Sequence, residues 1–353
     1  MAANSRKAKP MLDPAQPIAL FTEGTFGKIN AKMAEGILRY GSNPVAAVID
    51  SSQAGKRVRD LTPIASDVPI VASLDEARSL GAEVLVLGTA PSGGRLPAEW
   101  ISVLDQAIAA GMSLVNGMHD QLQPRFAERL GPGQWVWDLR VPQGEPPPIG
   151  MARAAALTNT RVLMVGTDMA IGKMTAGLEL TRALRNMGRD AAFLATGQTG
   201  IAITGRGIPL DAIRVDHAGG AVERMVLEAA DHDIVVVEGQ GSLLHPGSTA
   251  TLPLMRGSAC THMILCHRAG MDRLIDAEQV RIPPLREVIA LNEAVARAAG
   301  ALTPAKVVGI ALNTAKLGAS EAEAAIKAVA DETGLPVTDP VRNGAQVLAR
   351  ALA

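Results

Sequence analysis

A glycine-bounded loop in the second half of the chain carries the residues with the clearest chemical meaning. It lies between an apolar run at Val162–Val165, which predicts a buried strand, and a helix-forming run at Ala176–Met187. Glycines at such a junction let backbone N–H groups converge on an anion, the helix N-terminus adds its positive dipole, and Lys173 adds a full charge. The pattern predicts a phosphate-binding loop with the binding residues Gly166, Thr167, Asp168, Ala170, Ile171, Gly172, Lys173, Met174 and Thr175.

One position of this loop departs from the ordinary phosphate loop. There, a Ser or Thr directly after the lysine holds Mg²⁺ through its hydroxyl. Here Met174 occupies that position, and the first hydroxyl belongs to Thr175, one residue later. The loop therefore predicts that a phosphate-bearing ligand binds, but it does not by itself predict that the ligand is hydrolysed.

Three candidate acid–base groups follow predicted strands of the same half. Glu238 ends the apolar run Ile234–Val237, His245 follows the glycine-rich turn after it, and His267 follows the run that ends at Cys266. Because the carboxyl ends of parallel strands line the ligand crevice of an open α/β sheet, we expect these groups beside the phosphate loop. Glu238 is interpreted as a general base or as a carboxylate facing phosphates through a metal ion or water, and each histidine as a proton acceptor from an ammonium nucleophile. A turn-stabilising carboxylate and structural histidines are the alternatives.

Other polar residues at strand ends are candidates for ligand binding. Arg268 and Arg273 suit a carboxylate-bearing substrate through bidentate contacts, and a solvated helix start is their structural alternative. Thr199 lies in a run of small polar residues after the predicted strand Ala191–Ala195 and is a candidate for substrate binding. Asn313 follows another predicted strand, at a position where phosphate-loop proteins often contact a nucleotide base, and we group it with the phosphate-binding residues.

The first half carries a weaker signal of the same kind. Glu23 and Gly24 begin a glycine-containing turn after the first predicted strand, and Asp50 ends the next strand. The turn resembles a loosened dinucleotide fingerprint, although its glycines do not match G-x-G-x-x-G. Further glycine-rich strand exits occur at 88–94 and 116–120. We therefore expect the first half to hold ligand as well, with Glu23 and Gly24 in contact with substrate.

The composition bounds the fold and the partners. The chain has 353 residues, 48% of them hydrophobic and only 2% aromatic, so its core must consist of Ala, Val, Leu and Ile, as in buried parallel sheets. A net charge of −1 gives no reason to expect nucleic acid or an anionic membrane as partner, and no apolar run reaches the roughly 18 residues of a membrane span. Cys260 and Cys266 are expected to be buried thiols, although a disulfide or a metal site is formally open to them, and no metal is expected. We expect a cytoplasmic protein that forms a homo-oligomer.

Alternating apolar and helix-forming runs predict an α/β fold with two domains. Three consecutive prolines at Pro146–Pro148 mark a linker, because they fit neither a helix nor a central strand. The expected organisation is a flexible arm at 1–15, a Rossmann-like parallel-sheet domain at 16–141, a proline-rich linker at 142–152 and a doubly wound P-loop α/β domain at 153–353. Strands are expected at Ile18–Phe21, Val45–Ile49, Ile70–Val71, Val84–Leu87, Leu114–Val115, Val162–Val165, Ala191–Ala195, Ile234–Val237, His262–Cys266, Lys306–Leu312 and Pro336–Val337, and helices at Ile29–Tyr40, Ala98–Ala110, Ala176–Met187, Gly220–Ala230, Val288–Ala299 and Ser320–Glu332.

These motifs carry a resemblance at two levels. The loop at Gly166–Lys173 and the strand end at Val237–Gly241 are similar to the dethiobiotin-synthetase branch of P-loop proteins. Nearly the whole chain from Ile18 onward resembles the D-glutamate N-acetyltransferase family, formerly described as a domain of unknown function, in which a Rossmann-like domain precedes a P-loop domain. The motifs that carry this second resemblance are Thr22–Gly24, Trp137–Arg140, Gly166–Thr175, Ala195–Gly200 and Glu238–Ser242.

The resemblance implies an activity but no residue roles. It implies transfer of the acetyl group of acetyl-CoA to the amine of D-glutamate, an acidic amino acid, as part of D-amino-acid catabolism. The phosphates of acetyl-CoA would then occupy the loop without Mg²⁺-assisted cleavage, which is compatible with Met174. On this hypothesis Lys173 and the loop backbone bind the CoA phosphates, and Glu238 or His245 is the base.

Two other function classes remain open. An ATP-dependent ligase or kinase of the dethiobiotin-synthetase type would hold Mg²⁺ through Thr175 or Asp168 and would release ADP with an amine-bearing acid. A nucleotide-binding switch or chaperone would hydrolyse nucleotide slowly and would need a protein partner. An acetyltransferase instead releases free thiol from acetyl-CoA without a metal.

Overall fold

The computed structural model describes residues 12–89, 94–298, 302 and 304–352. The chain forms two compact units, one made of Met1–Pro142 with Ile201–Pro209 and the other of Gln143–Gly200 with Leu210–Ala353. Most of the arm expected at 1–15, and the middle of the glycine-rich exit at 88–94, lie outside the described residues.

The first unit is built on a parallel sheet of six strands in the order β3-β2-β1-β4-β5-β6. The order reverses between β1 and β4, which makes this the Rossmann-like sheet expected from the sequence, and such a reversal is where open α/β sheets bind ligands. The sequence analysis missed β6, which is short and ends in a carboxylate. The strands are β1 (Ile18–Phe21), β2 (Val45–Ile49), β3 (Ile70–Val71), β4 (Val84–Leu87), β5 (Ser113–Asn116) and β6 (Val136–Asp138).

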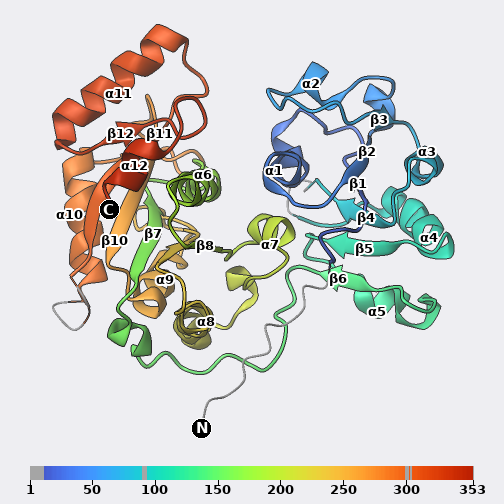
Figure 1. Ribbon diagram of the computed structural model, residues 1–353, viewed down its shortest axis with the longest axis horizontal. Coiled ribbons are helices and arrows are strands. Elements are labelled where there is room, and N and C mark those ends of the chain that lie inside the picture. The colour runs from blue at the N-terminus through green and yellow to red at the C-terminus, as the bar shows by residue number, and fades with distance from the viewer. Residues whose placement is uncertain (1–11, 90–93, 299–301, 303, 353) are drawn as a thin grey trace. The chain divides into compact units, whose positions relative to one another are not determined.

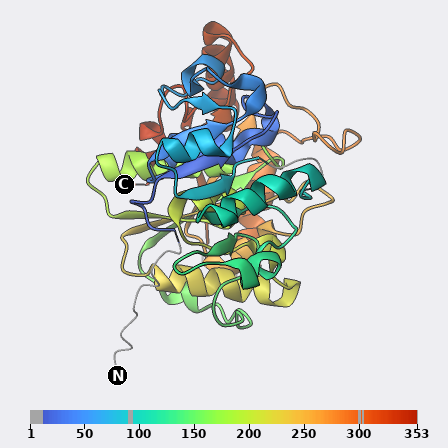
Figure 2. The ribbon, with the colours of Figure 1, turned by 90° about the vertical axis from the view of Figure 1, so that its right-hand side faces the viewer.

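Helices cover both faces of this sheet. Figure 1 shows α1 on one side and α3 and α4 on the other, where they face the viewer in Figure 2. Leu74 of α3 and Leu104 of α4 are buried with Leu85 of β4 in one apolar core. On the side of α1, the Ala34 N–H donates to the carbonyl oxygen of Gly88 (2.9 Å). The helices are α1 (Lys32–Tyr40), α2 (Val58–Leu61), α3 (Leu74–Ser79), α4 (Ile101–Ala109) and α5 (Gln123–Phe126).

The second unit contains another six-stranded parallel sheet, in the order β12-β11-β10-β7-β9-β8. Its central strands are continuously apolar because both faces are covered, as parallel sheets require. The strand that precedes the phosphate loop, β7, lies between β9 and β10, so the ends of those two strands flank the loop. The strands are β7 (Thr160–Gly166), β8 (Ala191–Leu194), β9 (Ile234–Val237), β10 (His262–Arg268), β11 (Lys306–Asn313) and β12 (Val337–Thr338).

Seven helices follow β7 along the described part of the chain, and the sequence analysis anticipated four of them. One of the seven, α7, begins in the second unit and ends in the first. The sequence analysis missed α7, α9 and α12. Glycine, proline and β-branched residues lower the intrinsic helix propensity of α7 and α9, and packing in the folded chain overrides that preference. No helix in the described part of the chain is both long and apolar enough to cross a membrane. The helices are α6 (Lys173–Asn186), α7 (Gln198–Thr204), α8 (Val215–Glu228), α9 (Thr251–Ser258), α10 (Leu285–Ala296), α11 (Ala319–Thr333) and α12 (Gln346–Arg350).

The proline-rich segment packs against α8 of the second unit. A Cβ atom on Gly220 of α8 would lie 1.8 Å from the carbonyl oxygen of Pro148, so only glycine permits this approach. The buried carboxylate of Glu223 accepts hydrogen bonds from the backbone N–H of Met151 and from the Arg153 side chain (3.1 Å). The segment is therefore an ordered part of the second unit.

Candidate functional site

The phosphate loop joins β7 to α6 through a backbone turn that few residue types adopt. Gly172, directly before α6, has a φ of 111°, a value that glycine reaches without strain. Ala170 also lies in the left-handed region, with a φ of 51°, and a non-glycine residue there costs on the order of 1 kcal/mol. Backbone strain of this kind concentrates at ligand-binding loops.

Lys173 is buried inside the loop, with 6% of its surface exposed. Its Nζ donates to the carbonyl oxygen of Asp168 (2.6 Å). Burial lowers the pKa of Lys173, and the nearby Cys266 and Asp168 oppose that effect. The lysine is therefore a desolvated cation held at the centre of the loop, which is the position from which it could contact a bound phosphate.

The carboxylate of Asp168 braces this loop. Its Oδ1 accepts the backbone N–H of Met169 (2.6 Å), and its Oδ2 accepts that of Ile275 in the segment after β10. The second of these bonds spans 2.9 Å. Both carboxylate oxygens thus already serve backbone donors, so this side chain holds the loop in shape.

Glu238 lies at the carboxyl end of β9 and is buried, with 5% of its surface exposed. Its Oε2 accepts the backbone N–H groups of Thr196 (2.7 Å) and Gly197 (3.1 Å), just before α7. Burial raises the pKa of Glu238 to about 7, although those two N–H groups and the charge of Lys173 act in the opposite direction. A buried carboxyl that titrates near neutral pH beside a cation is typical of catalytic sites.

Close packing at the next residue fixes where this carboxyl lies. A Cβ atom on Gly239 would be 1.6 Å from the carbonyl oxygen of Met164 in β7 and 3.0 Å from the Lys173 side chain. Glycine at this position therefore lets the end of β9 approach the strand that leads into the phosphate loop.

The two candidate histidines occupy different environments. His267, at the end of β10, places Nδ1 2.9 Å from the hydroxyl of Thr167 in the loop, and burial lowers its pKa to about 4. His245 accepts the backbone N–H of Gly247 on Nδ1 (3.0 Å), and its buried Nε2 has no hydrogen-bond partner among the described residues. His267 therefore contacts the loop directly, while His245 belongs to the turn after β9.

Two further predicted residues contact the loop and two do not. Arg268 donates to the carbonyl oxygen of Ala170 (2.9 Å), and Asn313 donates to that of Ile171 (3.2 Å). The ends of β10 and β11 therefore brace the loop from one side. Arg273 instead donates to the carbonyl oxygen of Glu278 in its own segment, and Thr199 lies half-buried in the first turn of α7.

Sequence reasoning did not assign a role to Ser242, although its position in a glycine-rich turn after β9 was a usable signal. Its hydroxyl donates to the carbonyl oxygen of Thr167 (3.0 Å), which ties that turn to the loop. Met174 and Thr175 are half-buried in the first turn of α6. Among the residues with described positions, no group of three or more His, Cys, Asp or Glu side chains is placed to hold a metal ion.

Comparison with known families agrees with this architecture. Residues 148–349 match the P-loop domain, and residues 51–142 the Rossmann-like domain, of the domain of unknown function DUF1611. The chain belongs to the DUF1611 family. Both domain types expected from the sequence are thereby confirmed.

Two relatives of this chain carry the name of an enzyme. A protein of Tritonibacter scottomollicae named D-glutamate N-acetyltransferase is 38% identical over 341 residues, which is 96% of this chain and 98% of that protein. A protein of the same name from a Pseudoalteromonas species is 33% identical over 77% of this chain and 82% of its own. The crystal structure of a DUF1611 family protein from Anabaena variabilis superposes with a TM-score of 0.92 at 48% identity, covering 96% of this chain and 99% of that one.

Two predicted substrate residues belong to the Rossmann-like unit of this DUF1611 protein. The Glu23 carboxylate accepts the backbone N–H of Ser51 (3.0 Å), and Gly24 adopts a φ of 69°. In the same turn, the buried carboxylate of Asp50 accepts the backbone N–H groups of Thr25 (3.1 Å) and Phe26 (3.0 Å). Donors that a dinucleotide fingerprint would offer to a pyrophosphate are thus taken by Asp50.

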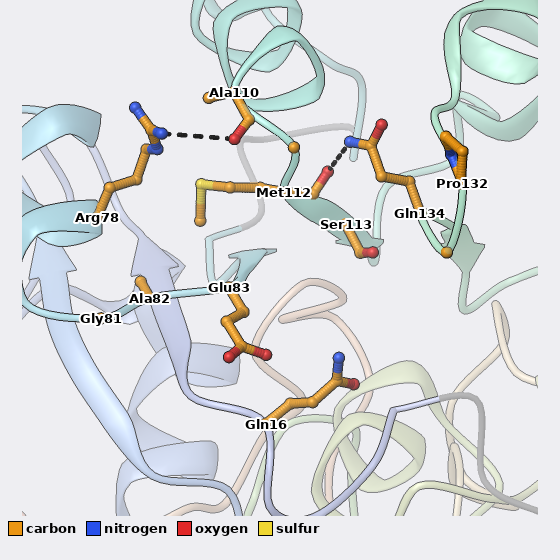
Figure 3. A pocket seen from close by; sticks show the side chains of 12 residues that line it. Gln16, Arg78, Gly81, Ala82, Glu83, Ala110, Met112, Ser113, Pro132 and Gln134 are labelled. Carbon is orange, nitrogen blue, oxygen red and sulfur yellow. Dashed lines mark hydrogen bonds between the residues drawn. The ribbon is translucent and has the colours of Figure 1, made fainter.

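A cavity of about 540 Å³ lies in the Rossmann-like unit (Figure 3). It is lined by residues that precede β4 and β5, at the amino edge of the sheet. Two of its polar side chains already have partners: Arg78 donates to the carbonyl oxygen of Ala110, and Gln134 to that of Met112 (2.8 Å). Open α/β sheets bind ligands at the opposite edge, so we do not assign this cavity to the site.

Proposed function

We propose that this chain is an N-acetyltransferase that moves the acetyl group of acetyl-CoA to the amine of D-glutamate. The names of two relatives of this chain support the reaction class. The observation that carries the proposal is the presence, in one site, of a phosphate loop and of a buried carboxyl, Glu238, with a pKa of about 7. At neutral pH such a carboxyl is partly ionised and can take a proton from an amine.

The phosphate loop would hold the CoA moiety. The pyrophosphate and 3′-phosphate of CoA are anions that a loop of backbone N–H groups and one lysine can bind without cleaving them. Lys173 would exchange its bond to the Asp168 carbonyl for a phosphate oxygen. The replacement of the Mg²⁺-binding hydroxyl by Met174 favours this use of the loop over nucleotide hydrolysis.

Acetyl transfer to an amine requires a base rather than further activation of the thioester. The amine nitrogen attacks the thioester carbonyl carbon, the C–S bond breaks, and CoA leaves as a thiolate. The proton lost by the amine passes to Glu238 and then to the thiolate sulfur. Because the thioester is already activated, the protein contributes orientation, the base and stabilisation of the oxyanion.

The two histidines are less suited to the role of base. Burial keeps the pKa of His267 at about 4, so its ring is a weak proton acceptor at neutral pH. In His245, Nδ1 accepts the Gly247 N–H, so the neutral ring carries its proton on Nε2 and presents a donor there. Glu238 is therefore the base in this proposal.

The decisive experiment measures free thiol released from acetyl-CoA in the presence of D-glutamate, with and without EDTA. We expect D-glutamate-dependent thiol release that EDTA does not reduce. Release that requires ATP, or no release with any amino acid, would refute the proposal. L-Glutamate and D-aspartate in the same assay report the enantiomer and chain length that the site accepts.

An ATP- and Mg²⁺-dependent ligase or kinase is the second candidate, because the Thr175 hydroxyl lies in the first turn of α6. It predicts Mg²⁺-dependent ADP formation with an amine-bearing acid. Measuring ADP alongside thiol separates the two candidates in one reaction mixture.

A further inference from the structure

The side-chain amide of Gln240 lies beside the proposed base, and the acetyl-transfer steps leave it without a role. Gln240 belongs to the glycine-rich turn that follows β9 and Glu238. A Cβ atom on Gly197 would overlap the amide nitrogen of Gln240 and would lie 3.5 Å from Oε1 of Glu238. The amide nitrogen and this carboxylate oxygen therefore flank the same glycine, and all three residues belong to the second unit.

The backbone around Gln240 is held on both sides. The hydroxyl of Thr251 in α9 donates to the carbonyl oxygen of Gln240 (3.0 Å). Before it in the chain, Gly239 packs directly against β7. After it, the hydroxyl of Ser242 donates to the carbonyl oxygen of Thr167 in the phosphate loop (3.0 Å). These contacts fix the point from which the Gln240 side chain extends, relative to the phosphate loop.

The Gln240 amide itself has no structural partner. The side chain is half-buried, and no described residue forms a hydrogen bond with its nitrogen or its oxygen. Oε1 of Glu238 also lacks a donor among the described residues, since both backbone N–H groups that this carboxylate accepts bind Oε2. Within the described part of the chain, the enclosed side-chain atoms without a partner are Nε2 of His245 and Oδ1 of Asn292. The Gln240 amide and Oε1 of Glu238 are therefore open to a ligand.

Acetyl transfer creates an anion close to the base. When the amine nitrogen attacks the thioester carbonyl carbon, an electron pair of the C=O bond moves onto the oxygen, and it returns when the C–S bond breaks. A base that accepts the proton of this nitrogen and a donor that binds this oxygen each make a hydrogen bond of about 3 Å, so they must lie within about 8 Å of each other. Oε1 of Glu238 and the amide nitrogen of Gln240, which flank Gly197, meet this condition.

We propose that the side-chain amide of Gln240 donates a hydrogen bond to the oxyanion of the tetrahedral intermediate. The inference rests on the proposed function, because this oxyanion belongs to acetyl transfer. Gln240 gives up no proton, and its neutral amide stabilises the oxygen without lowering the pKa of the adjacent carboxyl, as a cation would. Two cationic donors at the loop have other partners, since Lys173 donates to the Asp168 carbonyl oxygen and Arg268 to that of Ala170.

The first test replaces Gln240 by methionine, which removes the amide and keeps the length of the side chain. We expect kcat for acetyl transfer to fall about 100- to 1000-fold. The KM for acetyl-CoA and the KM for D-glutamate should stay nearly unchanged, because the oxyanion forms only after both substrates are bound. A merely structural role would not separate kcat from both KM values in this way. Gln346→Met is the matched control, since Gln346 is an exposed residue of α12 in the same unit.

The second test, Gln240→Glu, measures how close this side chain lies to Glu238. The substitution keeps the size of the side chain and replaces the amide donor by a carboxylate. A negative charge beside Glu238 raises the pKa of that carboxyl. The pH profile of kcat/KM, which reports the base of the free enzyme, should therefore shift to higher pH than in the wild type.

The outcomes separate this inference from the proposed function. If the wild type is active and Gln240→Met keeps its kcat, the inference is wrong and the proposed function stands, whether or not a KM rises. An unshifted pH profile in Gln240→Glu would place the amide away from the base and would also refute the inference. If the wild type transfers no acetyl group, the proposed function fails and the inference fails with it. Should circular dichroism show that Gln240→Met does not fold, Gln240→Ala, which only truncates the half-buried side chain, replaces it in the same assay.

Discussion

Replacing Glu238 by glutamine should remove a pH dependence of stability whose size follows from the site. In the folded protein this carboxyl keeps its proton up to a pKa of about 7, whereas in the unfolded chain it loses the proton near its ordinary value of 4.5. The folded state therefore binds more protons between these values, and its stability falls as the pH rises through this range. At about 1.4 kcal/mol per pKa unit, the full effect on the free energy of unfolding is about 3 kcal/mol.

The Glu238→Gln variant lacks this titration but keeps an oxygen that can accept the N–H groups of Thr196 and Gly197. Its free energy of unfolding, relative to the wild type, should therefore increase by about 2 to 3 kcal/mol from about pH 5 to about pH 8. Subtracting the wild-type values at each pH cancels the other titrating groups. Denaturant unfolding followed by far-ultraviolet circular dichroism provides the measurement.

The tryptophans supply an internal control. All three, Trp100, Trp135 and Trp137, belong to the Rossmann-like unit, whereas Glu238 belongs to the other. Tryptophan fluorescence should therefore follow unfolding of the first unit. If the two units unfold separately, the unfolding free energy measured by fluorescence should have the same pH dependence in the variant and in the wild type. A difference in unfolding free energy that stays constant across the pH range by circular dichroism would show that Glu238 does not titrate near neutrality. The same result would remove it as the base.

Three further predictions test other parts of the site. Lys173→Ala should raise the KM for acetyl-CoA about tenfold or more with little change in the KM for D-glutamate. Steady-state kinetics with each substrate varied in turn measures both values. A raised KM for D-glutamate with an unchanged KM for acetyl-CoA would contradict the prediction. Gly239→Ala should destabilise the protein by about 3 kcal/mol or more, since its Cβ would lie 1.6 Å from the Met164 carbonyl oxygen, so an unchanged melting temperature would contradict the described packing. Burial holds the pKa of His267 at about 4, so NMR titration should find this imidazole neutral at pH values well above 4, and a pKa in the usual range would restore it as a candidate base.

Strands with uniform apolar composition were predictable, and so was the order of the motifs at their ends. Ile234–Val237 appears in the structure with the bounds that its composition indicated. Elements whose stability comes from distant partners were not predictable. Helix α7 contains glycine and β-branched residues, and the N–H groups just before it are bonded to Glu238, more than thirty residues away in sequence.

The candidate site shows the same division between local and long-range information. The phosphate loop was evident because its glycines and lysine are consecutive. The sequence also placed Glu238 at the loop, since both follow parallel strands. It could not show that Arg268 and Asn313 donate to carbonyl oxygens of the loop, because the direction of a side chain depends on packing between strands.

The attachment of the proline-rich segment to α8 sets where the P-loop half can be separated from the rest of the chain. A fragment that starts at residue 153 would lack the backbone N–H of Met151 and would leave Gly220 facing water in place of Pro148. Part of the hydrogen bonding around the buried carboxylate of Glu223 would be lost, and an incompletely compensated buried charge is strongly destabilising. An autonomous fragment should therefore begin at Gln143, so that it keeps the proline-rich segment packed against α8 at its N-terminus.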